Sequence, residues 1–203
     1  MAAAQTSTRI VVLAGPSGSG KSRLANRLDL PVLRLDDFYR DGDDPALPRA
    51  FGIVDWDDPA SWDKDAAVAA ARALARDGAV DVPRYDIPTS RAVGTHHLDC
   101  HGASVAVAEG IFAAEVIPDL GDAGVLADAI CLTHWPVVTF VRRLTRDLRE
   151  SRKPPITLVR RGWSLMRVEP RVVAHQVALG AVPCTPAQAF ERIQALLPAP
   201  SRL

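Results

Sequence analysis

Residues 15–22 form a glycine- and serine-rich segment directly after a run of apolar residues near the start of the chain. The segment reads Gly-Pro-Ser-Gly-Ser-Gly-Lys-Ser, and the run Ile-Val-Val-Leu-Ala occupies residues 10–14. This order matches the pattern G-x-x-x-x-G-K-[ST], in which a buried strand leads through a tight turn into a helix. Backbone N–H groups in such a turn point at phosphate oxygens, and the helix N-terminus adds a positive partial charge. The segment therefore predicts a phosphate-binding loop.

The side chains of this loop have expected partners on a nucleoside triphosphate. Lys21 is expected to reach the outer phosphates, and the hydroxyl of Ser22 is expected to ligate Mg²⁺. The predicted nucleotide-binding residues are Gly15, Ser17, Gly18, Ser19, Gly20, Lys21 and Ser22.

Acidic residues follow two further predicted strands. Asp36 comes after the short predicted strand 31–35, and Glu109 follows the apolar run 104–108. Ligands of open parallel sheets bind at the carboxyl ends of strands, so both carboxylates are expected beside the phosphate loop. Asp36 is the candidate general base, because phosphoryl transfer needs a group that accepts the proton of the attacking hydroxyl. Strand alternation predicts that Asp37 points the other way, as an acid of a surface turn.

Glu109 lies among apolar residues. A carboxylate is costly in such a place unless a cation or a hydrogen-bond donor satisfies it. We therefore interpret Glu109 as a metal-associated carboxylate. The alternative is an acid at the start of a helix, where the helix dipole favours negative charge.

The elements that must position these residues alternate between strands and helices, which predicts an α/β fold with a mostly parallel sheet and helices on both faces. Strands are predicted at 9–14, 31–35, 104–108 and 129–133, with an edge strand at 80–85 that Pro83 interrupts. Helices are predicted at 21–28, 65–76, 137–150, 156–179 with a possible kink at Pro170, and 186–197 after an N-cap at Thr185. The polar stretch between Asp36 and about Ser61 is too long for a plain connector and is expected to be functional.

Length and composition indicate a single soluble domain. The chain has 203 residues, of which 48% are hydrophobic, enough for one sizeable core. No apolar stretch reaches the length of a membrane span, and the first residues do not form a secretory signal. The three cysteines lack metal-ligand spacing, so reduced thiols and a cytoplasmic location are expected.

The net charge is zero, but it is unevenly distributed. Residues 36–65 carry ten Asp and three basic residues, whereas residues 142–171 carry nine Arg and one Lys against three acids. Either segment alone fits a solvated face. Beside a phosphate loop, an acidic segment also suits substrate hydroxyls and a metal, and an arginine-rich segment suits phosphates. A nucleic-acid-binding protein would need a net basic charge and aromatic platforms, so nucleic acid is not an expected partner.

Six segments of the chain, taken together and in this order, resemble the uridine kinase family and, behind it, the wider phosphoribulokinase-like kinases. The resemblance covers about residues 9–150, and the order of the segments is more specific than the phosphate loop alone. The segments are 15–22, 36–40 (Asp-Asp-Phe-Tyr-Arg), 55–63 (Asp-Trp-Asp-Asp-Pro-Ala-Ser-Trp-Asp), 83–86 (Pro-Arg-Tyr-Asp), 109–112 (Glu-Gly-Ile-Phe) and 142–147 (Arg-Arg-Leu-Thr-Arg-Asp).

The resemblance implies that a single P-loop NTPase-type domain, residues 1–203, phosphorylates the 5′-hydroxyl of a pyrimidine nucleoside such as uridine or cytidine. ATP or GTP would be the donor, with Mg²⁺, and a helical lid at about 143–160 would close over the site. By position, Asp36 matches the catalytic acid that contacts the hydroxyl and the metal. Glu109 and Ser22 match the other metal-site residues.

The resemblance also assigns the acceptor side and the lid. Asp57 matches the acid that binds ribose hydroxyls, which suits a carboxylate facing a vicinal diol. Tyr85 matches the aromatic residue that lines the nucleobase site. Arg143 and Arg146 match lid arginines that approach the nucleotide and the substrate, and Arg146 joins Lys21 and Asp36 as a predicted catalytic residue.

Two departures from the family keep other functions open. The family usually has a histidine shortly after the Tyr-Asp pair, yet none occurs here between Asp86 and His96. The usual Arg-Gly-Arg of the lid is replaced by Glu-Ser-Arg-Lys-Pro-Pro at 150–155. The alternatives are a kinase of another alcohol, such as pantothenate or a sugar phosphate, and a nucleotide-binding module without catalysis. In each case the expected partner is a small molecule, not a membrane, and a homo-oligomer is possible.

Overall fold

The computed structural model describes residues 8–50, 52–133 and 170–198. Several predicted features lie outside the described residues. These are the helix 137–150, the lid at about 143–160, Arg143, Arg146 and most of the helix 156–179.

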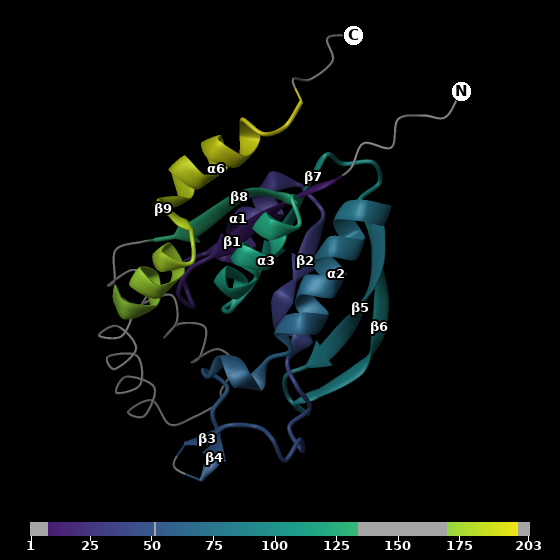
Figure 1. Cartoon of the computed structure of the whole chain (residues 1–203), viewed down its shortest axis with the longest axis vertical. Helices are drawn as coiled ribbons and strands as arrows, with labels where there is room; N and C mark the ends of the chain where they lie inside the picture. The colour runs from purple at the N-terminus through teal and green to yellow at the C-terminus, as the bar shows by residue number, and fades with distance from the viewer. Residues whose placement is uncertain (1–7, 51, 134–169, 199–203) are drawn as a thin grey trace.

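A five-stranded parallel sheet forms the centre of the described chain (Figure 1). Its order is β2-β7-β1-β8-β9, with β1 Arg9–Ala14, β2 Val32–Arg34, β7 Val105–Glu109, β8 Leu126–Leu132 and β9 Val182–Cys184. Leu13 of β1 and Arg34 of β2 both pair with Glu109, so the ends of three neighbouring strands meet at the same edge. This edge carries the loops that follow β1, β2 and β7.

Helices cover both faces of the sheet, as predicted. On one face, α1 Lys21–Leu28 and α6 Pro186–Gln194 pack against Val11 and Leu13. On the other, α2 Lys64–Asp77 and α3 Ile117–Asp122 pack against Ile10 and Val12. Alternate residues of β1 thus serve opposite faces, which explains why the strand reads as a continuous apolar run.

The helix ends follow local capping rules. Thr185 and Gln188 form a capping box at the start of α6, confirming the predicted N-cap. Gly78 ends α2 with a φ of 75° and donates its N–H to the Leu74 carbonyl. Residues 170–178 are helical, within the last part of the predicted helix 156–179. Among the described residues, no helix is long and apolar enough to cross a membrane.

One predicted strand belongs to a different sheet. The segment 80–85 was predicted as an edge strand, and within the described chain β5 Ala79–Asp86 pairs only with β6 Arg91–Asp99, in an antiparallel hairpin. The strand is confirmed, and it lies in a two-stranded sheet separate from the central one. Most of β6 is exposed. The hairpin forms a sheet of its own, in which β5 contacts α2 and η1.

The polar stretch predicted between Asp36 and Ser61 contains short elements only. They are the 3₁₀ helices η1 Leu35–Phe38 and η2 Pro59–Ser61 and the strand pair β3 Arg49–Ala50 with β4 Ile53–Val54. A further 3₁₀ helix, η3 Ala113–Val116, precedes α3. The hairpin and η1 contact one another beside α2, so this stretch faces the β5–β6 hairpin.

Candidate functional site

The predicted phosphate loop connects β1 to α1, and its glycines allow backbone conformations and packing that a side chain would prevent. Gly15 has a φ of 140°, and a Cβ atom there would lie 2.6 Å from the Leu132 carbonyl oxygen. Gly18 and Gly20 also adopt positive φ angles, of 84° and 99°. No side chain of the described residues caps the N-terminus of α1. The first N–H groups of this helix are therefore available to an anion.

Two polar groups inside the loop fit the expected phosphates. Lys21 is 8% exposed, and its Nζ donates hydrogen bonds to the carbonyl oxygens of Gly15 (2.7 Å) and Pro16 (3.2 Å). The hydroxyl of Ser19 is fully buried and has no hydrogen-bond partner among the described residues. A buried hydroxyl without a partner is unfavourable, and a phosphate oxygen would satisfy it.

Ser22 and Glu109 lie together beside this loop, in the first turn of α1 and at the end of β7. The hydroxyl of Ser22 donates to Oε1 and Oε2 of Glu109 at 3.1 and 3.3 Å. Burial and the negative charge of Asp36 raise the pKa of Glu109, and the positive charge of Lys21 opposes this shift. A hydroxyl and two carboxylates of this kind are the oxygen ligands that Mg²⁺ accepts, together with the phosphates of a nucleotide. The residues present therefore fit a magnesium ion.

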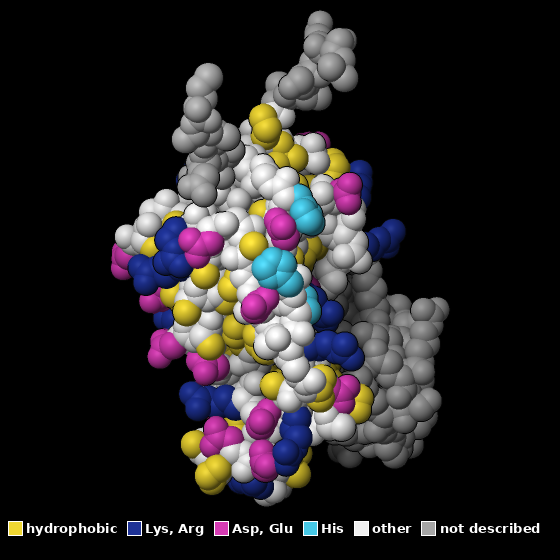
Figure 2. Space-filling view, turned by 90° about the vertical axis from the view of Figure 1, so that its right-hand side faces the viewer, with side chains coloured by type: hydrophobic (Ala, Val, Ile, Leu, Met, Phe, Trp, Pro, Cys, Tyr) yellow, Lys and Arg dark blue, Asp and Glu magenta, His cyan; other side chains and the backbone are white. Residues whose placement is uncertain are grey.

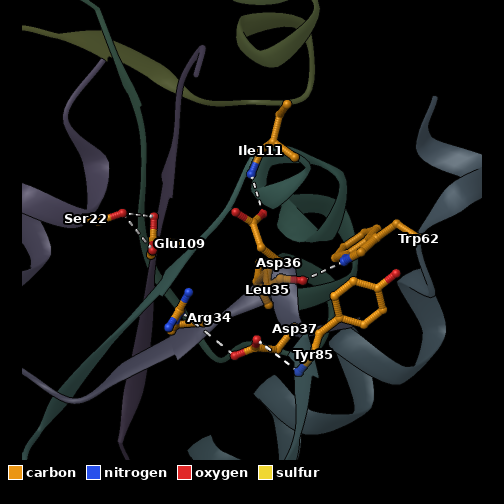
Figure 3. A network of polar contacts seen from close by, with 9 residues as sticks. All are labelled: Ser22, Arg34, Leu35, Asp36, Asp37, Trp62, Tyr85, Glu109 and Ile111. Carbon is orange, nitrogen blue, oxygen red and sulfur yellow. Dashed lines mark hydrogen bonds and ion pairs between the residues drawn. The ribbon is translucent and has the colours of Figure 1, made fainter. Parts of the chain in front are cut away.

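Asp36 is fixed by the chain that follows β7 (Figure 3). Its Oδ1 accepts a 2.9 Å hydrogen bond from the backbone N–H of Ile111. The residue before it, Leu35, is held from another side, because Nε1 of Trp62 donates to the Leu35 carbonyl at 2.6 Å. The predicted base, Asp36, thus lies in η1, between the end of β7 and the end of η2.

Asp37 differs from its prediction. It is not an acid of a surface turn, because it is 8% exposed and accepts a hydrogen bond from the backbone N–H of Tyr85 at 3.4 Å. Nε of Arg34 lies 3.9 Å from its Oδ2. Strand alternation does not apply here, since the chain turns into the 3₁₀ helix η1 directly after β2. Burial raises the pKa of Asp37 despite these partners.

An aromatic cluster lies beside η1, and of its residues only Tyr85 was predicted as part of the site. The ring of Tyr39 lies 5.6 Å from Trp56, 5.8 Å from Tyr85 and 6.0 Å from Phe112, measured between centroids. Its hydroxyl donates to the Trp56 carbonyl at 3.2 Å. Burial raises the pKa of Tyr39, and the charges of Asp36 and Asp57 raise it further. Tyr39 and Trp56 could have been found as the aromatic residues next to the acids of the quoted segments.

The two predicted acceptor-side residues lie at this cluster. Asp57 is exposed, and its negative charge reaches the hydroxyl of Tyr39. Tyr85 packs against Tyr39 from the hairpin, but its own hydroxyl donates to the Arg40 carbonyl at 3.1 Å. The structure therefore brings Asp57 and Tyr85 together near Asp36. The rings of Tyr39, Trp56 and Tyr85 form what we call the aromatic wall. The hydroxyl of Tyr85 is thus bonded within the chain, and its ring is part of the aromatic cluster.

Histidines lie in strand β6 of the hairpin and directly after it. Figure 2 shows histidine side chains beside acidic ones on one face of the molecule, and the nearest pairs are His97 with Asp81 (2.8 Å) and His101 with Asp99 (3.5 Å). His96 pairs with Val82 across the hairpin. Within the described ranges, no group of three or more His, Cys, Asp and Glu side chains is placed to hold a metal ion.

The chain is similar to proteins named uridine kinase. It is 36% identical over 154 residues to one from Schizosaccharomyces pombe, a match that covers 69% of this chain but only 32% of that protein. It is 28% identical over 169 residues to one from Staphylococcus aureus, covering 79% of this chain and 78% of that protein. The chain thus spans about a third of its fungal relative and most of its bacterial one.

A solved structure shares the fold. A protein from Silicibacter sp. TM1040 described as a fructose transport system kinase superposes with a TM-score of 0.62 at 21% identity, covering 86% of this chain and 88% of that one. No family model matches the chain. The parallel sheet, with helices on both faces and a glycine-rich loop after its central strand, is the fold predicted from the sequence. The chain is thus similar in sequence to proteins named uridine kinase, and it shares its fold with a solved kinase structure.

Proposed function

We propose that this protein transfers the γ-phosphoryl group of ATP or GTP to the 5′-hydroxyl of a pyrimidine ribonucleoside, uridine or cytidine. The observation that carries the proposal is the hydrogen bond from Ile111 to Asp36. It joins the candidate base to the chain that directly follows Glu109, so the donor and acceptor sides meet at one edge of the sheet. The uridine kinase relatives support the same reaction.

The chain's own residues have separate tasks in this reaction. The phosphate loop and Lys21 would hold the triphosphate, while Asp36 accepts the proton of the attacking hydroxyl. The new bond forms between the hydroxyl oxygen and the γ-phosphorus, and the bond to the bridging oxygen breaks as the nucleoside diphosphate leaves. Ser22, Glu109 and Asp36 would hold Mg²⁺, which neutralises phosphate charge when bound. Arg143 and Arg146 are proposed to contact the phosphates from the lid.

The acceptor would lie along the aromatic wall. The rings of Tyr39, Trp56 and Tyr85 offer apolar surface for a planar base. The exposed carboxylate of Asp57 would accept hydrogen bonds from both hydroxyls of a ribose. This geometry predicts a preference for ribonucleosides over their 2′-deoxy analogues, because the analogue leaves one of these bonds unmade.

A panel of acceptors tests the proposal. The release of ADP from labelled ATP is measured with uridine, cytidine, their 2′-deoxy analogues, pantothenate and sugar phosphates. We expect the highest kcat/KM with uridine or cytidine, and we expect Asp57→Asn to reduce the preference for ribose. No acceptor-dependent ADP release from any compound would contradict the kinase proposal and favour a nucleotide-binding module.

A kinase of a different alcohol is the second candidate. The hydroxyl of Tyr85 is bonded to the Arg40 carbonyl, and the turn of the hairpin supplies no histidine. Both facts remove polar groups that would read a base. If pantothenate or a sugar phosphate gives the highest kcat/KM in the panel, this second candidate replaces the first.

A further inference from the structure

Three consecutive residues of η1 accept hydrogen bonds from three different segments of the chain (Figure 3). The Leu35 carbonyl accepts from Trp62 after η2, Asp36 accepts from Ile111 after β7, and Asp37 accepts from Tyr85 in β5. The proposed reaction uses only Asp36. The carboxylate of Asp37 is buried directly beside it, and the reaction assigns it no task.

The surroundings of Asp37 show that its partners come from several directions. Arg34 approaches from β2 and the Tyr85 N–H from β5, and the charge of His96 on β6 favours the ionised carboxylate. The neighbouring Asp36 opposes ionisation. Burying a carboxylate without such partners is unfavourable. The buried position of Asp37 therefore calls for a structural explanation.

The hairpin supplies that explanation. Within the described residues, β5 and β6 are not hydrogen-bonded to the central sheet. Hydrogen bonds between strands therefore do not fix the position of Tyr85 relative to Asp36. The pairing passes from Pro83 opposite Thr95 to Tyr85 opposite Ala92, so one residue of β5 faces two residues of β6. A bulge of this kind changes the direction of the strand. Directly after it, the N–H of Tyr85 meets Asp37.

We propose that Asp37 is a positioning residue, which holds the Tyr85 wall of the acceptor site at a fixed place relative to Asp36. This inference rests on the proposed function and adds a specificity role for a residue outside the reacting atoms. The distance of 3.4 Å is long for an N–H···O hydrogen bond. Asp37 acts through the backbone of Tyr85 and touches neither nucleotide nor acceptor.

The test compares Asp37→Ala and Asp37→Asn with the matched control Asp81→Ala. Asp81 is an exposed acid in β5, the strand that also contains Tyr85, and its carboxylate pairs with His97. For each full-length variant, the KM values for uridine and ATP are measured, together with hydrogen exchange of the Tyr85 and Ile111 amides. We expect Asp37→Ala to raise the KM for uridine about tenfold while the KM for ATP stays within about twofold. We also expect the Tyr85 amide to lose protection against hydrogen exchange in this variant, and the Ile111 amide to keep it.

The remaining outcomes decide between positioning and plain structure. Asp37→Asn is expected to recover most of the acceptor KM, because its amide oxygen still accepts from the Tyr85 N–H. Equal rises in both KM values would overturn the proposal in favour of a general structural role. So would an unchanged KM for uridine in Asp37→Ala. If that variant does not fold, Asp37→Leu, which fills the site without an acceptor, carries the same expectation.

The exchange measurement separates this inference from the proposed function. A wild-type protein that phosphorylates no nucleoside contradicts the kinase proposal. In that case, unchanged protection of the Tyr85 amide in Asp37→Ala overturns the positioning role as well, whereas a selective loss of protection supports it.

Discussion

Gly110 and Asp36 are in such close contact that no side chain fits between them. A Cβ atom at Gly110 would lie 2.8 Å from Oδ1 of Asp36 and 3.0 Å from Cβ of Leu35. Real Cβ atoms do not approach other atoms that closely. The absence of a side chain at Gly110 therefore allows the end of β7 to hold the candidate base through the N–H of Ile111.

Gly110→Ala is expected to displace the Asp36 carboxylate and to lower kcat about 100-fold. The new methyl group pushes Oδ1 away from the Ile111 N–H, and a shift of about 1 Å at a catalytic group has an effect of this size. Nucleotide affinity should change little, because the phosphate loop is not touched. Steady-state kinetics and a nucleotide-binding titration check both statements.

Gly121→Ala is the matched control. Gly121 lies in α3, and a Cβ atom there meets nothing within 4 Å. This change should leave kcat at the wild-type value and stabilise the fold by up to about 1 kcal/mol, because alanine favours a helix over glycine. Equal activity of the two alanine variants would show that Asp36 does not need its present position.

Asp36→Asn is expected to lower acceptor-dependent turnover by about 10²- to 10⁴-fold without weakening nucleotide binding. The amide oxygen still accepts from Ile111, so the turn keeps its shape, but the side chain no longer accepts the proton of the acceptor. Asp122→Asn, at an exposed acid of α3, serves as the control. Unchanged turnover in Asp36→Asn would mean that another group is the base.

Tyr85→Phe and Tyr85→Ala separate the ring of Tyr85 from its hydroxyl. The hydroxyl donates to the Arg40 carbonyl, so Phe should change the KM for the acceptor by no more than about threefold, the effect of one partly exposed hydrogen bond. Alanine removes the ring that packs against Tyr39 and should raise the KM at least tenfold, about 1.4 kcal/mol. A large effect of Phe would instead show that the hydroxyl contacts the acceptor.

Strands β1, β7 and β8 of the central sheet were predictable because they are buried along most of their length. Such strands read as short apolar runs, and chemistry-bearing residues such as Lys21 and Glu109 mark their carboxyl ends. Because these strands pair in parallel, the loops after β1, β2 and β7 could be predicted to meet at one edge of the sheet. The placement of Asp36 beside Glu109 is the result of this rule.

The acceptor side was less predictable because it depends on contacts between distant segments. β6 is exposed along most of its length, so it has no apolar pattern that would indicate a strand. β9 has three residues, including Pro183, and was also missed. The burial of Asp37 required the hairpin to approach η1, and neither the 3₁₀ turn nor the hairpin's separate sheet can be read from local propensities.

Cys131 gives a prediction for alkaline pH. This thiol is fully buried at the end of β8 and donates to Oε1 of Gln176 at 3.2 Å. Burial raises the pKa of Cys131 from 9.0 to about 11. Between these two values the unfolded chain loses the proton while the folded protein keeps it. The folded state thus binds more protons, and the free energy of unfolding must decrease as the pH rises through this window.

Cys131→Ala should reduce this decrease. Each unit of difference in pKa corresponds to about 1.4 kcal/mol, so the two proteins should differ in their pH-dependent loss by about 2 kcal/mol at pH 11. Urea unfolding at intervals between pH 7 and pH 11 measures the effect. Below about pH 8 the two curves should run parallel, because the thiol is almost entirely protonated in both states. Parallel curves up to pH 11 would show that Cys131 ionises as readily in the folded protein as in the unfolded chain, and that its burial carries no electrostatic cost.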